Sequence, residues 1–299
     1  MASLLIHAIE QGLAFGIAAL GVFLTYRILK FPDLTVDGSF VTGAAIASLL
    51  IVNHGFDPFS VLLIAFAAGS LAGVLTGLLN TRLGITNLLA GVLTMIMLYS
   101  INLRIMGRPN LSLLRAETAT RVVERIWTPL GSLSILVFIA LLTFAIKLVL
   151  DAFLRTELGF ALRATGDSES MITAQGVNTK TMKVLGLALS NGLVALSGAL
   201  VAQYSGFADI GMGIGMIVTG LAAVIIGGTL IRSQRVGWMT LSVLVGSLIY
   251  RVAITLALRY GYVVGFQASD LKLITAILVI LALVLPRIRE QRMKRVRAC

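Results

Sequence analysis

The 299-residue sequence is 58% hydrophobic and only 12% charged, and its mean hydropathy is +0.99. Because soluble domains carry about a quarter of their residues as charges, this composition excludes an ordinary soluble protein and indicates that the lipid bilayer is the solvent. The net charge of +11 does not indicate nucleic-acid binding, since no basic segment carries the aromatic or base-reading partners that such a surface needs. The basic residues crowd instead into the C-terminal segment, residues 286–299, as is typical of a cytoplasmic tail, at Arg287, Arg289, Arg292, Lys294, Arg295 and Arg297.

Apolar runs long enough to cross a bilayer, roughly 20 residues each, recur along the chain and predict an all-α bundle of eight or nine transmembrane helices. The whole chain, residues 1–299, is expected to form one transmembrane domain. The predicted spans are Leu4–Leu29, Phe40–Val52 with a start near Val36, Phe59–Leu79, Thr86–Met106, Leu133–Leu150, Val184–Tyr204, Ile210–Ile231, Trp238–Leu258 and Leu271–Leu285.

Two polar intervals separate these spans. Residues 107–130 mix charged and apolar positions and predict a short amphipathic helix along the membrane interface, with Trp127 at headgroup level. Residues 155–183 predict two short helices: Gly166 and Asp167 end the first, and Gly176 ends the second. Asn178 or Thr179 is then expected to cap the next span. From periodicity alone, an ordinary solvated loop is the alternative for residues 155–183.

Nine spans place the two chain ends on opposite sides of the membrane. A cytoplasmic basic tail then puts the N-terminus outside and residues 155–183 inside. The outer loops would still carry several arginines, which conflicts with the usual excess of basic residues on the inner side. The opposite orientation would place the basic tail outside, a larger violation. The arginines on the outer side would be Arg104, Arg108, Arg115, Arg121, Arg125 and Arg259.

Polar side chains inside spans are costly in hydrocarbon, so they are expected to face the bundle interior or a cavity. For Asp33 and Asp37, helix capping and a functional role are equally good interpretations. For Asn191, packing between helices is favoured over function. The candidates for a translocation pathway are Asp37, Ser39, Asn87, Thr94, Asn102 and Asn191, and further polar positions inside spans are Glu10, Gln11 and Gln203.

Motifs for chemistry are missing from the sequence. It has no Gly-Lys-Ser/Thr phosphate loop, and the G-x-G-x-G at Gly211–Gly215 lies in an apolar run, where an unwound or closely packed helix entrance is the simpler interpretation. His7 and His54 lack the clustered partners of a metal site, and Cys299 is the single cysteine. We therefore expect neither an enzyme nor a cofactor or metal in this chain.

Several motifs resemble a known family. ELGFALRATGDSESMITAQGVNTKTMK and the following S-N-x-x-x-x-L-S-G-A-L helix resemble the coupling segment of ABC-transporter permeases of the branched-chain amino acid type. FPDLTVDGSF and NLLAGVLTMIMLYSINLRIMGRPNL resemble a narrower amino-acid-linked or uncharacterised branch. Asp37 and Ser39 occupy a place where relatives often carry a different polar pair. The residues that match the coupling pattern are Arg163, Ala164, Gly166, Asp167, Gly176 and Asn178.

The resemblance implies a multi-pass subunit of the bacterial cytoplasmic membrane that forms a dimeric pore, with a homodimer favoured and a heterodimer as the alternative. Its partners would be a second permease subunit, two cytoplasmic ATPase subunits that bind ATP and Mg, an extracytoplasmic substrate-binding protein, and membrane lipid. The coupling residues would dock in the ATPase groove, and the solute would be an amino acid, with a nucleoside or another small solute as alternatives.

Two other functions remain as alternatives. An ion-gradient-driven secondary transporter or channel would need acidic residues deep in its spans, where Glu10 is the main example. A membrane scaffold without transport is compatible with the composition but does not account for the coupling-like segment.

Overall fold

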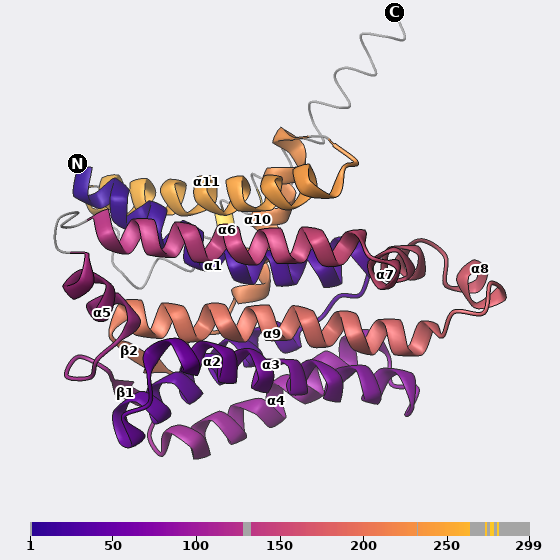
Figure 1. Cartoon of the computed structure of the whole chain (residues 1–299), viewed down its shortest axis with the longest axis horizontal. Helices are drawn as coiled ribbons and strands as arrows, with labels where there is room; N and C mark the ends of the chain where they lie inside the picture. The colour runs from indigo at the N-terminus through magenta and orange to yellow at the C-terminus, as the bar shows by residue number, and fades with distance from the viewer. Residues whose placement is uncertain are drawn as a thin grey trace, which may run out of the picture.

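A computed structural model describes residues 2–127, 133–231 and 233–263, together with helical positions 273, 276, 277 and 280. Figure 1 shows long helices lying side by side, with short elements gathered at both of their ends. The elements are α1 (Ala2–Phe23), the π-helix η1 (Leu24–Ile28), α2 (Thr35–His54), α3 (Pro58–Thr81), α4 (Asn87–Met106), β1 (Asn110–Ser112), α5 (Ala119–Ile126), α6 (Leu133–Arg155), α7 (Glu157–Asp167), α8 (Glu169–Ala174), α9 (Thr179–Ser205), β2 (Phe207–Asp209), α10 (Met216–Leu230) and α11 (Val236–Val263).

Seven helices in the described part of the chain are long and apolar enough to cross a membrane, which confirms an all-α polytopic architecture. The predicted span Ile210–Ile231 is wrong in its first part, because α10 begins only at Met216 and has 15 residues. Most of the predicted span Leu271–Leu285 and the basic tail lie outside the described residues. The total of eight or nine spans therefore stays a prediction.

Helix α9 is the centre of the bundle and packs against α1, α2 and α3. Small residues allow this close approach: a Cβ atom added to Gly73 of α3 would overlap the Leu187 carbonyl oxygen, and one added to Gly198 of α9 would overlap that of Phe40. The predicted small-residue faces of α9 are thus confirmed. Ser190 and Ser197 on the same helix donate hydrogen bonds to backbone carbonyls of α1 at Gly21 and Ala14.

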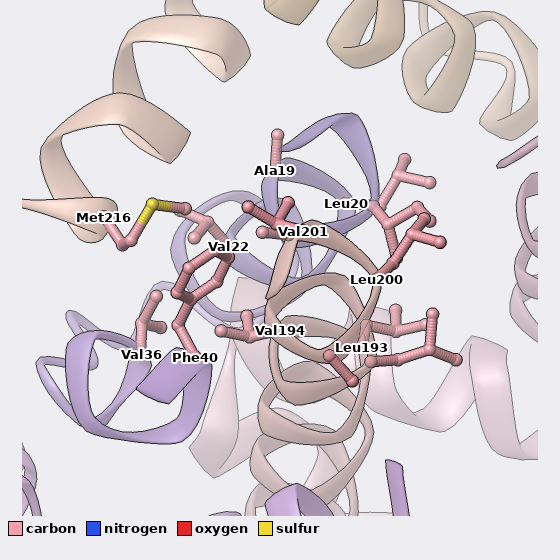
Figure 2. Close-up of a cluster of buried hydrophobic side chains, with 14 of the residues drawn as sticks. Ala19, Leu20, Val22, Val36, Phe40, Leu193, Val194, Leu200, Val201 and Met216 are labelled. Atoms are coloured by element: carbon pink, nitrogen blue, oxygen red, sulfur yellow. The ribbon is translucent and has the colours of Figure 1, made fainter. Parts of the chain in front are cut away.

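Apolar side chains from four helices fill the spaces around α9. Figure 2 shows Val194 and Val201 of α9 with Val22 of α1, Phe40 of α2 and Met216 of α10 gathered around them. These side chains are all buried. The core therefore fixes α1, α2 and α10 relative to α9.

The two ends of the bundle carry different short elements (Figure 1). At one end, which we call the sheet end, β1 pairs antiparallel with β2, so that Leu111 lies opposite Ala208, and α5 lies beside them. At the other end, the α7–α8 end, the two short helices extend beyond the long ones. The amphipathic helix predicted within residues 107–130 is α5, which ends at Ile126 and is followed by the exposed Trp127. Which end faces the cytoplasm stays a prediction.

The predicted folding of residues 155–183 into two short helices is confirmed. Helix α7 ends at Asp167, α8 is followed by Gly176 with a φ of 87°, and the Asn178 side chain caps α9 by accepting a hydrogen bond from the Thr181 backbone N–H over 3.2 Å. An irregular solvated loop is therefore not the structure of this segment.

Candidate translocation and coupling site

The chain between α1 and α2 is irregular. The last turn of the first span widens into η1, and Lys30 follows with a φ of 53°, a value uncommon for residues other than glycine. The Phe31 backbone N–H then bonds back to the Thr25 carbonyl over 2.8 Å. The chain therefore reverses direction before α2 begins. We call residues 29–34 the break.

The break carries a buried polar network with α2 and α9. Asn191 of α9 donates from its amide nitrogen to Asp33 over 2.7 Å, and its amide oxygen accepts from the Ser39 hydroxyl over 2.7 Å. Asp33 also accepts from the Thr35 backbone N–H over 2.9 Å, so it caps the start of α2. Burial raises the pKa of Asp33, and the hydrogen bonds from Thr35 and Asn191 oppose that rise. Asn191 thus ties three segments together.

Asp37 serves a helix that is distant in the sequence. Its two carboxylate oxygens accept hydrogen bonds from the backbone N–H groups of Gly215 and Ile217, over 2.9 and 2.8 Å. These amides are the unpaired donors at the N-terminus of α10, where a negative charge is favourable. Capping is therefore confirmed for Asp37, although the helix capped is α10 and not its own helix.

The glycine run before α10 explains why this cap forms. Residues 210–215 make turns between β2 and α10, as expected for an unwound helix entrance. A Cβ atom at Gly213 would overlap the Asp37 carbonyl oxygen, and Gly215 has a φ of 86°, where side chains are disfavoured. Broken helices of this kind frame the binding sites of many transporters. The sequence signal was G-x-G-x-G, but nothing in it pointed to Asp37.

A pocket with a volume of about 400 Å³ lies against this junction. Asp37, Asn102 and Tyr99 are among its polar lining residues, and Met95 and Ile214 are among its apolar ones. Asn102 is fully buried, and its amide nitrogen donates to the Gly38 carbonyl over 3.2 Å. Tyr99 and the apolar lining were not among the predicted pathway residues.

Two of the predicted pathway residues, Thr94 and Asn87, form their hydrogen bonds away from Asp37 and the start of α10. The Thr94 hydroxyl donates to the Ala90 carbonyl of its own helix. Asn87 accepts from the Asn80 side chain over 2.7 Å at the turn between α3 and α4. Ser39 and Asn191 are bonded to each other, and Asp37 and Asn102 line the same pocket. The structure does not bring Asn87 or Thr94 into either pair.

The other polar residues inside spans brace the sheet end. Glu10 is buried and accepts a hydrogen bond from the Tyr204 hydroxyl over 2.8 Å, and His7 lies 2.9 Å from the same carboxylate. Gln203 donates to the Pro58 carbonyl and accepts from the Ala119 backbone N–H. Gln11 lines a small pocket near the start of α1.

At the α7–α8 end, α7 is joined to the break. Lys30 forms an ion pair with Asp167 over 2.9 Å, and a Cβ atom at Gly166 would overlap the Ile28 carbonyl oxygen. Gly166 therefore lies within the last turn of α7 as a contact point with η1. Any displacement of α7 must move Ile28 and Lys30 or break these contacts.

The same end contains a wide cavity of about 910 Å³. Three predicted coupling residues, Arg163, Ala164 and Asp167, line it together with Arg27 and Lys30. The Arg163 guanidinium lies 4.5 Å from the centre of the Phe160 ring, and its Nε atom has no hydrogen-bond partner among the described residues. Gly176 faces open space, and Asn178 caps α9. The docking role of these residues stays a prediction.

Comparison with known families decides the classification. A family model described as the permease component of the branched-chain amino acid transport system matches residues 4–284. The chain belongs to this permease family. The resemblance predicted from the coupling-like segment and the α9 motif is thereby confirmed.

Individual relatives of the permease carry transport names. A tyrosine transport system permease protein of Clostridioides difficile (strain R20291) is 43% identical over 276 residues, which cover 92% of this chain and 89% of that protein. An uncharacterized protein of Rickettsia prowazekii (strain Madrid E) is 36% identical over 286 residues, 94% and 97% of the two chains. The autoinducer 2 import system permease protein LsrC of Yersinia pestis (strain Pestoides F) is 27% identical over 214 residues, 71% of this chain and 57% of that one. No solved structure matches the chain.

The family and the seven apolar helices make this chain a multi-pass membrane permease of the ABC-transporter type, not a classical enzyme. A permease component works as one part of a transport system. Its partners in that system follow from the family at the level of class, and their identities are treated as proposals below.

Proposed function

We propose that this permease forms half of a dimeric translocation pathway that imports an amino acid, driven by ATP hydrolysis in separate cytoplasmic subunits. In this proposal the α7–α8 segment docks in a groove of the ATPase, and an extracytoplasmic binding protein delivers the solute at the sheet end. The observation that carries the proposal is the contact of α7 with η1 and the break through Gly166 and the Lys30–Asp167 ion pair.

This contact offers a mechanical route from the α7–α8 end into the bundle. Lys30 is followed within the break by Asp33, which bonds to Asn191 of α9. Asn191 bonds in turn to Ser39 of α2. Two residues before Ser39, Asp37 caps the start of α10. A displacement of α7 would therefore reach α2, α9 and α10 through bonded groups. π-Helical turns such as η1 are frequent at functional sites.

The route gives ATP binding a way to change the pathway. Closure of the ATPase dimer would shift α7 and α8, and the break would carry that shift to α2 and α10. Such a switch needs the ATPase to bind one arrangement of the permease more tightly than the other. The exposed cavity at the α7–α8 end, with its Arg163 guanidinium, supplies polar groups for that differential contact.

The solute class rests on a relative. The Clostridioides difficile protein that is 43% identical over most of both chains is named for tyrosine transport. At that identity and coverage, the simplest inference is that this permease also transports an amino acid. The autoinducer 2 import protein covers less of the chain at lower identity, so it carries less weight for the solute.

The test is ATP-driven amino-acid uptake into proteoliposomes containing the permease with its ATPase and binding protein. Asp167→Lys is expected to lower uptake about tenfold, a typical size for coupling between two sites. The change should leave thermal stability nearly unchanged, because exposed ion pairs contribute little to it. Uptake and ATP hydrolysis equal to those of the unmodified protein would show that α7 is not the coupling element.

The chain offers a matched control at the opposite end. Glu117 and Arg125 form an ion pair over 2.8 Å, with both side chains mostly exposed, beside α5. Glu117→Lys breaks a pair of the same kind and should leave basal ATP hydrolysis, measured without the binding protein, unchanged. Restoring the opposite charges with Lys30→Asp in the Asp167→Lys variant should recover uptake if the internal ion pair transmits the motion. Failure of this rescue would assign Asp167 to direct docking instead.

A secondary transporter predicts a different result in the same assay. Uptake by the permease alone, driven by an ion gradient and unaffected by the ATPase, would overturn the proposed function. The buried acid Glu10 is bonded to Tyr204 at the sheet end, and under an ATP-driven mechanism it serves to hold α1 against α9.

A further inference from the structure

The pocket beside Asp37 has an unusual set of polar atoms. Asn102 is fully buried, and its amide nitrogen is committed to the Gly38 carbonyl. That bond fixes the orientation of the amide, because the oxygen cannot donate to a carbonyl. The Asn102 Oδ1 atom is then left without a hydrogen-bond partner in the described part of the chain. A buried acceptor without a partner is destabilising, so a donor supplied by a ligand would be favourable here.

Asp37 adds a second acceptor to the same wall. Its two oxygens accept the backbone N–H groups of Gly215 and Ile217. A carboxylate has about four acceptor sites, so Asp37 retains capacity for another donor. The N-terminus of α10 is in turn occupied by Asp37 and is not open to an anion. The pocket therefore favours a hydrogen-bond donor with positive charge.

The remaining wall is apolar and limits the size of the ligand. Val41, Met95, Ile96 and Ile214 line the pocket, and its volume of about 400 Å³ lies at the small end of the usual range for ligand sites. Such a space accommodates one small molecule with a charged end and an apolar body.

We propose that this pocket binds the ammonium group of the transported solute between Asp37 and Asn102, with the apolar part of the solute against α4 and the turn before α10. The inference rests on the proposed function and deepens it, since it assigns an amine-recognition site inside the permease. Among the pocket residues, the Tyr99 and Ser100 hydroxyls could donate to the carboxylate of an amino acid, but neither group is charged. The charged ammonium group therefore carries the recognition.

Binding to the permease alone tests this assignment without the ATPase. The full-length chain is placed in nanodiscs of phosphatidylcholine and phosphatidylglycerol, which lack primary amines. Three probes are compared: L-tyrosine, tyramine, which lacks the carboxylate, and 3-(4-hydroxyphenyl)propionate, which lacks the amine. Tyrosine and tyramine should bind with similar dissociation constants, and the propionate at least tenfold more weakly. Equal dissociation constants for all three probes would overturn the proposal. So would the absence of tyrosine and tyramine binding at concentrations of about 1 mM.

Two variants locate the binding in the pocket. Asn102→Leu should weaken tyramine binding about tenfold, because it removes the acceptor for the buried ammonium group. Ile214→Trp, at a side chain that is 66% exposed, should fill the pocket and abolish binding without disturbing the core. The control is Ile101→Trp on α4, which is 47% exposed and does not line the pocket. Tyramine binding unchanged in Ile214→Trp would place the amine elsewhere and contradict the assignment.

A lipid headgroup could supply the same ammonium chemistry, and a second nanodisc composition separates the two sources. With phosphatidylethanolamine in the bilayer, tyramine should bind as before if the pocket serves the solute. Loss of tyramine binding in those nanodiscs would assign the pocket to lipid and overturn the solute role. Because no ATPase is present, failure here leaves the uptake test of the proposed function intact, and failure of that test leaves these binding constants unaffected.

Discussion

The amide nitrogen of Asn191 lies 2.7 Å from the Asp33 carboxylate, and this bond joins the centre of α9 to the irregular break between η1 and α2. The two residues are 158 positions apart in the sequence. The amide oxygen of Asn191 also accepts a hydrogen bond from the Ser39 hydroxyl. One side chain therefore donates to the break and accepts from α2. Asn191 therefore joins three elements through hydrogen bonds, as the favoured interpretation of packing between helices expects.

Replacing Asn191 by Leu should destabilise the permease. The change keeps the side-chain size but deprives the buried Asp33 Oδ2 atom and the Ser39 hydroxyl of their Asn191 partner, at a cost of about 2 kcal/mol. Ser39→Ala removes only the bond between the hydroxyl and the Asn191 amide oxygen and should cost about 1 kcal/mol or less. Unfolding in detergent, followed by circular dichroism, measures both changes.

The control for Asn191 is Thr94→Val, because the Thr94 hydroxyl bonds only within its own helix. We expect the free energy of unfolding to change by less than about 0.5 kcal/mol, since no neighbouring element loses a hydrogen bond. A similar loss of stability in Asn191→Leu and Thr94→Val would show that the Asp33–Asn191–Ser39 network has no special weight.

Two adjacent glycines in α10 should respond in opposite ways to the same change. A Cβ atom at Gly227 would overlap the Ser242 carbonyl oxygen of α11, whereas one at Gly228 meets nothing within 4 Å. Gly227→Ala should therefore cost about 1–3 kcal/mol through overpacking. Gly228→Ala should be neutral or stabilise α10 by up to about 1 kcal/mol, as alanine favours helix over glycine. Equal unfolding temperatures for the two variants would contradict the close crossing of α10 and α11.

The cap of α10 by Asp37 predicts a graded effect. Asp37→Asn retains one acceptor oxygen but loses the negative charge, whereas Asp37→Ala removes the cap entirely. The alanine variant should lose about 1–2 kcal/mol and the asparagine variant less, because Asn is a good capping residue. Hydrogen exchange at the amides of Gly215 and Ile217 is the direct readout. Exchange rates that stay unchanged in Asp37→Ala would show that these amides do not depend on the carboxylate.

Local patterns in the sequence were sufficient for several features. Apolar runs predicted the long helices, and the breakers around residues 155–183 predicted α7 and α8 with their ends, because capping and helix termination depend on neighbours within a few residues. The serines and glycines of α9 predicted a closely packed helix for the same reason. The family resemblance depended on these same motifs and was confirmed.

Tertiary structure alone decided which polar groups meet. Asp37 and Gly215 are 178 positions apart. Hydropathy predicted one span across the start of α10, because the turns before it are apolar as well. From the sequence, Asn87, Thr94 and Asn102 were equal candidates for the pathway, whereas of these three only Asn102 lines the pocket beside Asp37. Periodicity reports which face of a helix is apolar, but it carries no information on which distant helix supplies the hydrogen-bond partner. The long helices and the paired short ones were thus determined by the sequence, and the junction of the break, Asn191 and the half-length α10 was decided by the packing of helices around α9.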